Sequence, residues 1–367
     1  MIQLSTPIFE SRSAAPTVLS LFSGAGGMDL GFIQAGCRIV HASDFDSVAC
    51  ETYRANIGAH THHQDVSSLR GADLPYAEVL IGGPPCQGFS VAGHMRQDDH
   101  RSQLVWEFVR LVGECKPKMF VMENVKALAQ LERFSHIRAQ LMKRFSMLGY
   151  AVNMLLVNAA DYGVPQRRER VLFIGVADGI VPISAINPRE VSRVTVRDAI
   201  GMLPPPGIAP NLGICGAMVV LAAHPVLRRS PYAGMLFNGQ GRPVALDATV
   251  NTLPASMGGN RTPIIDECEL RNRAQPWVVG YHKGLLAGVS PGGPSPGFLR
   301  RLTVTEAALL QTFPSGFVFK GSQCAQYRQI GNAVPPKLST AVASVVVEHL
   351  SGGSVGALNS SQQMMFA

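Results

Sequence analysis

The first 180 residues alternate short apolar runs with stretches of helix length, and this alternation limits the possible folds more than any other feature. The runs predicted as strands are Thr17–Phe22, Arg38–Ala42, Glu78–Ile81, Lys118–Met122, Ala151–Val157 and Arg170–Val176. Amphipathic stretches such as Ser102–Glu114 and Arg133–Leu148 lie between them. Strands separated by helices predict an α/β fold, a mostly parallel sheet with helices on both faces. Ligands bind such sheets where the carboxyl ends of the strands meet.

The texture changes from about Val181 to Gly297. Proline- and glycine-rich segments such as Leu203–Gly207 and Ser290–Gly297 interrupt any regular period. This pattern predicts a loop-rich insertion and no further sheet-and-helix units. Regular structure is expected again at Thr303, where T-x-x-E forms a capping box, and a helix is expected over Pro335–Leu350.

Composition narrows the class of protein. Hydrophobic residues make up 46% of the 367 and charged residues only 16%, which predicts a folded chain. No apolar run is long enough to cross a bilayer, and the N-terminal residues do not resemble a secretory signal, so we expect a cytoplasmic protein without a membrane partner. The seven cysteines include no C-x-x-C pair, so neither a disulfide framework nor a metal site is expected.

Positive charge is concentrated in the middle of the chain. Between Asp178 and Arg301 there are 12 Lys and Arg against 7 Asp and Glu, a balance of +5, whereas the rest holds 20 against 18, or +2. A polyanionic partner fits this distribution, although an ordinary basic surface would also produce it.

Three predicted strand ends carry residues suited to an adenosine-containing cofactor. Small residues after the first strand let the backbone approach a ligand closely, an acid after the second can bind ribose hydroxyls, and the aromatic beside it can pack on adenine. These candidates are Phe22, Ser23, Gly24, Gly27, Asp44, Phe45, Asp65 and Val66. The pattern alone does not separate NAD from S-adenosylmethionine, but its glycines depart from G-x-G-x-x-G, which favours the latter.

A rigid turn surrounds one cysteine. Gly82-Gly-Pro-Pro-Cys-Gln-Gly-Phe-Ser90 directly follows a predicted strand, so Cys86 is expected at the ligand-binding edge. A buried, inert thiol is the better interpretation for the other six cysteines. For Cys86 the stiff turn favours a reactive nucleophile.

Two further segments carry charge at strand ends. Glu123 ends an apolar strand, where an acid is costly to bury without a role, although a capping or salt-bridged carboxylate is the alternative. Arg168 and Arg170 precede a buried strand and are expected to alternate on one side at the sheet edge, where they could contact phosphate or bases. A solvated charge run is the alternative for these arginines.

Taken together, the motifs resemble those of the C5-cytosine-specific DNA methyltransferase family. The matching segments, in order, are FSGAGGMDLGF, GGPPCQGFS, MENV, Gln166–Arg170 and Tyr327–Pro336, and the resemblance covers roughly residues 17–345. It implies a Rossmann-like catalytic domain that binds S-adenosylmethionine over residues 1–189, a smaller target-recognition domain over 190–322, a helix returning to the catalytic domain over 323–351, and a disordered tail over 352–367.

The resemblance also implies roles for residues at matching positions. Cys86 would be the nucleophile that attacks a flipped-out cytosine, Glu123 the acid that protonates its N3, and Arg168 and Arg170 would hold the base and its surroundings. Pro84 and Asn332 join the donor-binding candidates above. Asp44-Phe45 departs from the frequent Glu-Trp, which weakens the expected donor affinity.

Double-stranded DNA is the partner that the resemblance implies. The polar stretch Ser90–Arg101 resembles a loop that closes over DNA, and the glycine-rich loops of the middle segment carry amide, aromatic and arginine groups that can read bases. The DNA-binding candidates are Ser90, Arg101, Gln166, Thr252, Leu253 and Arg261. A restriction endonuclease acting on the same site is a further expected partner, and the chain itself is expected to be a monomer.

Three other functions use parts of this pattern. A tRNA cytosine-C5 methyltransferase would share most motifs, but the basic insertion between Arg170 and Thr303 favours a DNA reader. An inactive DNA-binding accessory protein would not need Cys86 and Glu123. A nicotinamide oxidoreductase would leave the Pro-Pro-Cys turn unexplained.

Overall fold

The computed structural model describes residues 15–85, 100–179, 186, 193–289 and 294–352. At its centre is a seven-stranded sheet in the order β3-β2-β1-β4-β5-β8-β6. Its strands are β1 (Thr17–Leu21), β2 (Arg38–Asp44), β3 (Thr61–His63), β4 (Val79–Gly82), β5 (Met119–Val125), β6 (Ala151–Asn158) and β8 (Glu169–Val176). Each of the six predicted runs overlaps one of these strands, and five of the strands extend beyond the predicted bounds by one to three residues.

The sheet is mostly parallel, as predicted. β1 pairs in parallel with both β2 and β4, and the parallel set extends to β3 on one side and β5 on the other. Only β8 runs antiparallel to its neighbours β5 and β6. Later strands are therefore added to the sheet on both sides of β1, so the strand order reverses between β1 and β4. Open α/β sheets bind ligands at the carboxyl ends of the two strands at such a switch point.

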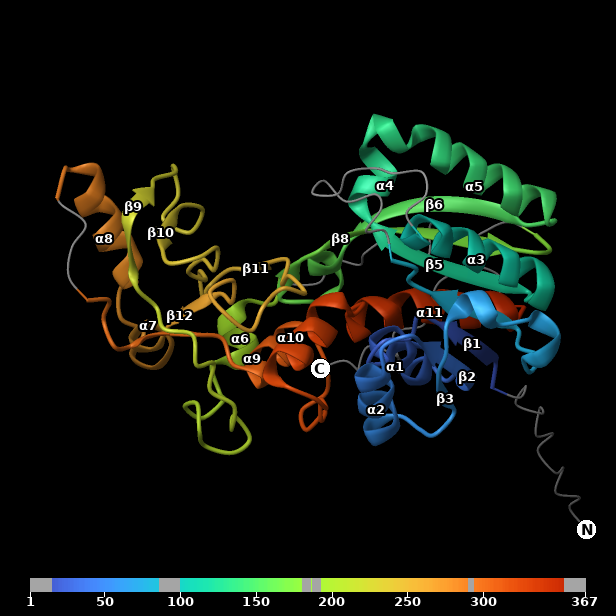
Figure 1. Ribbon diagram of the computed structural model, residues 1–367, viewed down its shortest axis with the longest axis horizontal. Coiled ribbons are helices and arrows are strands. Elements are labelled where there is room, and N and C mark those ends of the chain that lie inside the picture. The colour runs from blue at the N-terminus through green and yellow to red at the C-terminus, as the bar shows by residue number, and fades with distance from the viewer. Residues whose placement is uncertain (1–14, 86–99, 180–185, 187–192, 290–293, 353–367) are drawn as a thin grey trace, which may run out of the picture.

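Helices cover both faces of the sheet (Figure 1). The helices of one face are α1 (Gly27–Gln34), α2 (Ser47–Asn56) and α11 (Pro336–Leu350), and those of the other are α3 (His100–Cys115), α4 (Lys126–Gln130) and α5 (Ser135–Met147). Two separate apolar clusters fill these layers: Phe32 and Val342 belong to the first, Phe108 and Phe145 to the second. The single-turn 3-10 helices are η1 (Val66–Ser68), η2 (Gly71–Asp73), η4 (Glu132–Phe134) and η5 (Ala159–Tyr162).

The late helix α11 packs tightly on the early helix α1. A Cβ atom at Gly31 would lie 2.4 Å from Cβ of Ser339, so only glycine permits this approach. Ser339 Oγ donates a hydrogen bond of 2.6 Å to the Met28 carbonyl. The expected helix over 335–350 and its return to the sheet are thus present, while the domain boundaries themselves stay a prediction.

The middle of the chain is more regular than predicted. It contains α6 (Val196–Ile200), β9 (Leu221–Val226), β10 (Met235–Phe237), β11 (Val250–Asn251), β12 (Ile264–Asp266), α7 (Glu267–Asn272), α8 (Trp277–Leu286) and β13 (Leu299–Arg301). The predicted loop-rich insertion therefore also contains short strands and helices, but none of these described strands joins the seven-stranded sheet. These strands have six residues or fewer and pair only in twos, so their sequences show no lasting period. Leu236, Phe237 and Val278 belong to a small core of their own. In Figure 1 the elements that carry these residues, β10 and α8, lie apart from the seven-stranded sheet.

The chain then returns through α9 (Val304–Leu310) and α10 (Gln323–Asn332). The predicted capping box is confirmed, because Thr303 and Glu306 each accept a hydrogen bond from the other's backbone N–H. None of the helices in the described part of the chain is long and apolar enough to cross a membrane.

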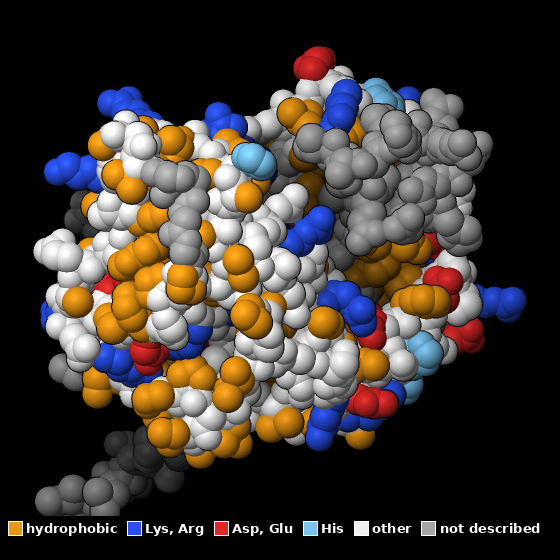
Figure 2. Space-filling view, turned by 60° about the vertical axis from the view of Figure 1, so that its left-hand side comes forward, with side chains coloured by type: hydrophobic (Ala, Val, Ile, Leu, Met, Phe, Trp, Pro, Cys, Tyr) orange, Lys and Arg blue, Asp and Glu red, His pale blue; other side chains and the backbone are white. Residues whose placement is uncertain are grey.

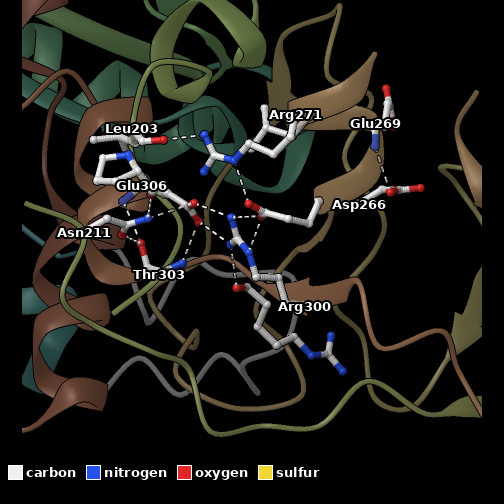
Figure 3. A network of polar contacts seen from close by, with 12 residues as sticks. Leu203, Asn211, Asp266, Glu269, Arg271, Arg300, Thr303 and Glu306 are labelled. Carbon is white, nitrogen blue, oxygen red and sulfur yellow. Dashed lines mark hydrogen bonds and ion pairs between the residues drawn. The ribbon is translucent and has the colours of Figure 1, made fainter. Parts of the chain in front are cut away.

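A ladder of four alternating charges joins the middle segment to α9 (Figure 3). Arg271 Nε lies 2.7 Å from one oxygen of Glu267, whose other oxygen is 2.6 Å from Arg300 Nη2. Arg300 also binds both oxygens of Glu306, at 2.8 and 2.6 Å. Arg271 Nη1 continues the ladder to the Leu203 carbonyl, at the end of the α6 region. The ladder therefore links α6, α7, β13 and α9 into one unit.

We expect Arg300→Met to destabilise the protein strongly, because the buried Glu306 would lose its cationic partner. Breaking a buried ion pair at one partner costs about 3–5 kcal/mol. Arg328→Met is the matched control, since Arg328 forms an exposed pair with Asp46, worth at most about 1 kcal/mol. Urea unfolding of both variants measures the difference, and equal losses would contradict the assigned strength of the ladder.

A second buried carboxylate lies under the turn after β1. Asp29 is fully buried in the first turn of α1, and it accepts hydrogen bonds from Ser20 Oγ at 2.9 Å and Tyr53 Oη at 2.8 Å. Burial raises the pKa of Asp29 to about 6, against the lowering effect of these two hydrogen bonds.

This shift predicts a pH-dependent contribution to stability. The folded state binds the Asp29 proton more tightly than the unfolded chain, so its contribution is full below about pH 4 and is lost as pH rises through about 6. The free energy of unfolding of Asp29→Asn should therefore rise relative to the wild type by roughly 2–3 kcal/mol between pH 4 and 7. Urea unfolding of both proteins at the two pH values tests this, and a constant difference would contradict it.

Candidate active site

Candidate functional residues gather at the carboxyl edge of the sheet, where the turns after β1, β2 and β4 come together. The predicted parallel order has this consequence, because parallel strands present the same end to one edge. Figure 2 shows a hollow between the two parts of the molecule, with hydrophobic side chains on its floor and Lys or Arg side chains on one rim.

The turn after β1 has the backbone shape of a ligand cradle. Phe22 and Gly24 both have φ of 54°, in the left-handed region. The N–H of Ser23 donates to the Ser43 carbonyl at 3.0 Å, and the N–H of Gly24 donates to Asp44 Oδ2 at 2.7 Å. A Cβ atom at Gly24 would meet nothing within 4 Å, so the turn opens onto free space in which a ligand could lie against the backbone.

The turn after β2 adds an acid and an aromatic ring. The Asp44 carboxylate accepts hydrogen bonds from the N–H groups of Gly24 and Asp46, and burial raises its pKa. Phe45 is 75% exposed, and its ring makes an edge-on contact with His63. An exposed ring beside an acid is the arrangement expected for stacking on adenine and binding ribose hydroxyls.

The other donor-binding candidates lie around these turns. Asp65 caps η1 through a 2.9 Å hydrogen bond from Ser67 N–H, and Val66 is buried. Asn332 is exposed at the end of α10, just before the segment whose Val334 carbonyl contacts Gly27: a Cβ at Gly27 would lie 2.4 Å from that oxygen. The open cradle, the acid and the exposed ring together fit an adenosine-containing donor.

The turn after β4 packs against the end of β5. The buried Pro84 accepts a 3.1 Å hydrogen bond from Asn124 Nδ2 through its carbonyl. A Cβ at Gly83 would lie 3.3 Å from Glu123 Oε2, so this turn passes close to the carboxylate. Cys86 and Ser90 lie outside the described residues; Pro85, which immediately precedes Cys86, is the last described residue of the turn.

Glu123 and Arg170 form an ion pair at the same edge. Arg170 Nε lies 2.7 Å from Glu123 Oε1, and both side chains are largely buried. Antiparallel pairing of β5 with β8 brings them together, with Val125 opposite Arg170 and Glu123 opposite Leu172. The carboxylate is thereby held with one oxygen on a cation and the other toward the turn that leads to Cys86.

Arg168 does not lie at the surface as expected. Its side chain is 2% exposed, and Nη2 donates a 3.0 Å hydrogen bond to the Gly331 carbonyl. Nε and Nη1 are buried without a partner among the described residues. Burial, and then the charge of Arg170, lower the pKa of Arg168. The predicted contact of Arg168 with phosphate or bases stays a prediction; the structure shows that Arg168 is a buried cation with two donors that lack a partner among the described residues.

The DNA-binding candidates divide into exposed and buried residues. Thr252 and Arg261 are exposed, and Thr252 Oγ1 donates to the Arg167 carbonyl at 2.8 Å. Gln166 and Leu253 are fully buried, and Gln166 Oε1 accepts the Leu253 N–H at 3.0 Å. The side chain of Arg101 lies outside the described part of the structure.

Sequence reasoning missed two amides that organise this site. Asn124 fixes the Pro84 carbonyl, and Gln311 connects Gln166 to the segment before α11, donating to the Ala333 carbonyl at 2.6 Å. Short β11 pairs with β7 (Gln166–Arg167) beside this contact. A buried glutamine after an apolar helix gives little signal, because its partner is 145 residues away.

Comparisons with known proteins agree with this geometry. A family model described as C-5 cytosine-specific DNA methylase matches residues 17–203 and 253–348. Type II methyltransferase M1.HphI of Haemophilus parahaemolyticus is 37% identical, over 90% of this chain and 87% of that protein. Type II methyltransferase M.XorII of Xanthomonas oryzae pv. oryzae is 34% identical, over 91% and 85%.

Solved structures share the fold. The S. pombe Dnmt2 methyltransferase has a TM-score of 0.67 at 20% identity, over 91% of this chain and 99% of that one. The Entamoeba histolytica methyltransferase EhMeth has a TM-score of 0.65 at 15% identity, over 92% and 99%. From the family match and the relatives of similar length, the chain belongs to the C-5 cytosine-specific DNA methylases and is a DNA cytosine methyltransferase.

Proposed function

We propose that this methyltransferase moves a methyl group from S-adenosylmethionine to carbon 5 of a cytosine that has swung out of duplex DNA, through a transient bond to Cys86. The observation that carries the proposal is the Glu123–Arg170 pair beside the Gly83–Pro84 turn, because that turn leads directly into the cysteine. An acid held next to a nucleophile is the combination that this chemistry needs.

The chemistry starts from the low reactivity of the ring. Carbon 5 of cytosine belongs to an aromatic ring and is a poor nucleophile. Addition of the Cys86 thiolate to carbon 6 breaks the aromaticity and gives carbon 5 enamine character. Glu123 offsets the charge that would build up on the ring by giving a proton to N3. S-adenosylmethionine, when bound, supplies an electrophilic methyl group to carbon 5, and loss of the carbon 5 proton then expels the thiolate.

The arginines have different tasks in this proposal. Arg170 orients the Glu123 carboxyl group through their 2.7 Å contact. Arg168 is buried with two donors that have no partner among the described residues, so it is suited to hold an acceptor that arrives with the reacting base or the neighbouring chain. Extrusion of the base costs a few kcal/mol, which contacts of this kind would offset.

The donor would lie along the turns after β1, β2 and β3. Gly24 offers an open backbone, Asp44 an acceptor for ribose hydroxyls, and Phe45 a face for adenine. Asp65, Val66, Pro84 and Asn332 complete the set of proposed donor contacts.

The middle segment would read the DNA sequence. Thr252 and Arg261 are exposed on its loops and can reach DNA, whereas the buried Gln166 and Leu253 would act from behind by holding the Thr252 loop in place. The names of the Type II relatives support a place in a restriction-modification system, with an endonuclease of the same specificity as partner. We propose that the enzyme acts as a monomer in the cytoplasm.

The covalent step predicts that Cys86→Ala abolishes methyl transfer but leaves DNA binding largely intact. A duplex that carries 5-fluorocytosine at the modified position should become attached to the wild-type protein at residue 86 in the presence of donor, because fluorine cannot leave as a proton does. Mass spectrometry of the attached peptide identifies the residue. Cys115→Ala is the matched control, since Cys115 ends α3 and precedes the opposite end of β5.

Full attachment by the Cys115 variant and none by the Cys86 variant is the expected pair of results. Substantial turnover by Cys86→Ala would refute the assigned nucleophile.

The recognition step predicts that exchange of residues 190–298 for the same segment of a Type II relative changes the methylated sequence and not the chemistry. The segment taken from the relative should have a carboxylate at the position of Glu267. Arg300 lies outside the exchanged range and would otherwise lose this ion-pair partner. Bisulfite-type mapping of DNA from expressing cells reads the outcome. A folded, active chimera with the original specificity would count against this segment as the reader.

A further inference from the structure

Four side chains from four different segments are connected by hydrogen bonds beside the proposed donor site. Ser20 lies on β1, Asp29 on α1, Tyr53 on α2, and His60 precedes β3. Tyr53 Oη is 2.8 Å from Asp29 Oδ1 and 3.1 Å from His60 Nε2. Because the single hydroxyl proton of Tyr53 goes to the carboxylate, the imidazole donates to the tyrosine oxygen. None of these four residues has a part in the methyl transfer described above.

The carboxylate is costly where it lies. Ser20, Asp29 and Tyr53 are essentially inaccessible to solvent, and no cation pairs with Asp29 among the described residues. Its position in the first turn of α1 offsets part of the cost, because the N-terminal end of a helix favours negative charge. A buried charge retained in this way is expected to fix a geometry that apolar packing would not specify.

Tyr53 contacts the donor turn as well as Asp29. A Cβ atom at Gly26 would lie 3.0 Å from Cδ2 and Cε2 of Tyr53, so the ring packs directly under the backbone of the turn. Asp29 lies on α1, three residues after Gly26. The tyrosine therefore supports the turn with its ring and fixes the helix that follows the turn with its hydroxyl group.

The same tyrosine is rigidly connected to the second donor turn. Helix α2 begins after Asp46, whose side chain caps it by accepting the N–H groups of Val48 and Ala49. Asp46 in turn donates its N–H to Asp44, the proposed ribose acceptor. The two donor turns are thus joined twice, in front by Gly24 N–H to Asp44 and behind by Tyr53 to Asp29.

We propose that Tyr53 and Asp29 are positioning residues of the donor site, which hold the turn Phe22–Gly27 at the distance from Asp44–Phe45 that S-adenosylmethionine requires. They act through the backbone of the two turns and do not touch the donor. This inference rests on the proposed identity of the donor, but on neither the cysteine nor the DNA.

Tyr53→Phe tests the connection, because it keeps the ring under Gly26 and removes only the hydroxyl group. Without the hydroxyl group, Asp29 Oδ1 loses the hydrogen bond from Tyr53, and α1 and α2 are no longer joined by that contact. We expect the dissociation constant for S-adenosylmethionine, measured by calorimetric titration without DNA, to rise roughly tenfold. At saturating donor, kcat on a duplex carrying the mapped site should stay within about twofold, because the reacting groups are untouched.

Tyr150→Phe is the matched control. Tyr150 is also a buried tyrosine, and its hydroxyl group donates a 2.7 Å hydrogen bond to the Pro117 carbonyl, before the opposite end of β5. It should lower the free energy of unfolding as Tyr53→Phe does, while the donor dissociation constant stays at the wild-type value. If both variants weaken donor binding equally, the role of Tyr53 is structural only and the inference fails.

Two substitutions of Asp29 separate geometry from charge. Asp29→Asn can still accept from Tyr53 and donate to the Ser20 hydroxyl group, so donor affinity should remain within about threefold of the wild type. Asp29→Ala removes both hydrogen bonds and should match Tyr53→Phe. If Asp29→Asn weakened S-adenosylmethionine binding as much as Asp29→Ala, the inference would be overturned. The negative charge of Asp29, and not its hydrogen bond with Tyr53, would then determine the affinity. Failure of the wild-type protein to bind S-adenosylmethionine would refute the proposed donor itself.

Discussion

The parallel pairing of β1 with both β2 and β4 is the constraint on which the rest of the molecule depends. Because all three strands run in the same direction, the segments that follow them meet at the carboxyl edge of the sheet. The glycine-rich turn, the acid with its exposed ring, and the turn that leads to the cysteine are all segments of this kind. Hydrogen bonds then fix their spacing: Gly24 to Asp44 on one side, and Asn124 to Pro84 on the other.

The one reversal in the sheet has its own consequence. A parallel strand in the place of β8 would enter the sheet at the opposite edge, and Arg170 would lie far from Glu123. With β8 antiparallel, the strand begins where β5 ends, and the arginine meets the carboxylate at 2.7 Å. The proposed catalytic pair thus depends on a change of strand direction near the edge of an otherwise parallel sheet.

Much of this could be predicted from the sequence, for reasons that differ between residues. The six strands and the α11 helix have strong local patterns, because each contains a short run of apolar residues and is bounded by turn residues. The capping box at Thr303 is equally local, since both of its hydrogen bonds join residues three apart. The donor turns followed from strand order, which needs only the alternation of strands and helices.

Long-range partners could not be predicted in the same way. The burial of Arg168 depends on the Gly331 carbonyl, 163 residues away, and that of Gln166 on Gln311 and Leu253. No spacing rule connects such residues. Arg168 and Arg170 are both arginines in the same short segment, so the sequence does not show which of the two is buried. The small strands and α8 of the middle segment are stabilised by a core that only they share, so their apolar residues carry no recognisable period.

The contact of Gly31 and Met28 with Ser339 has a consequence for synthesis of the protein. Ser339 lies 311 positions after Met28, so the chain makes α11 long after α1. Until α11 has been synthesised, the apolar surface of α1 that it covers lacks this partner. Partly folded species that expose apolar surface in this way are prone to aggregation.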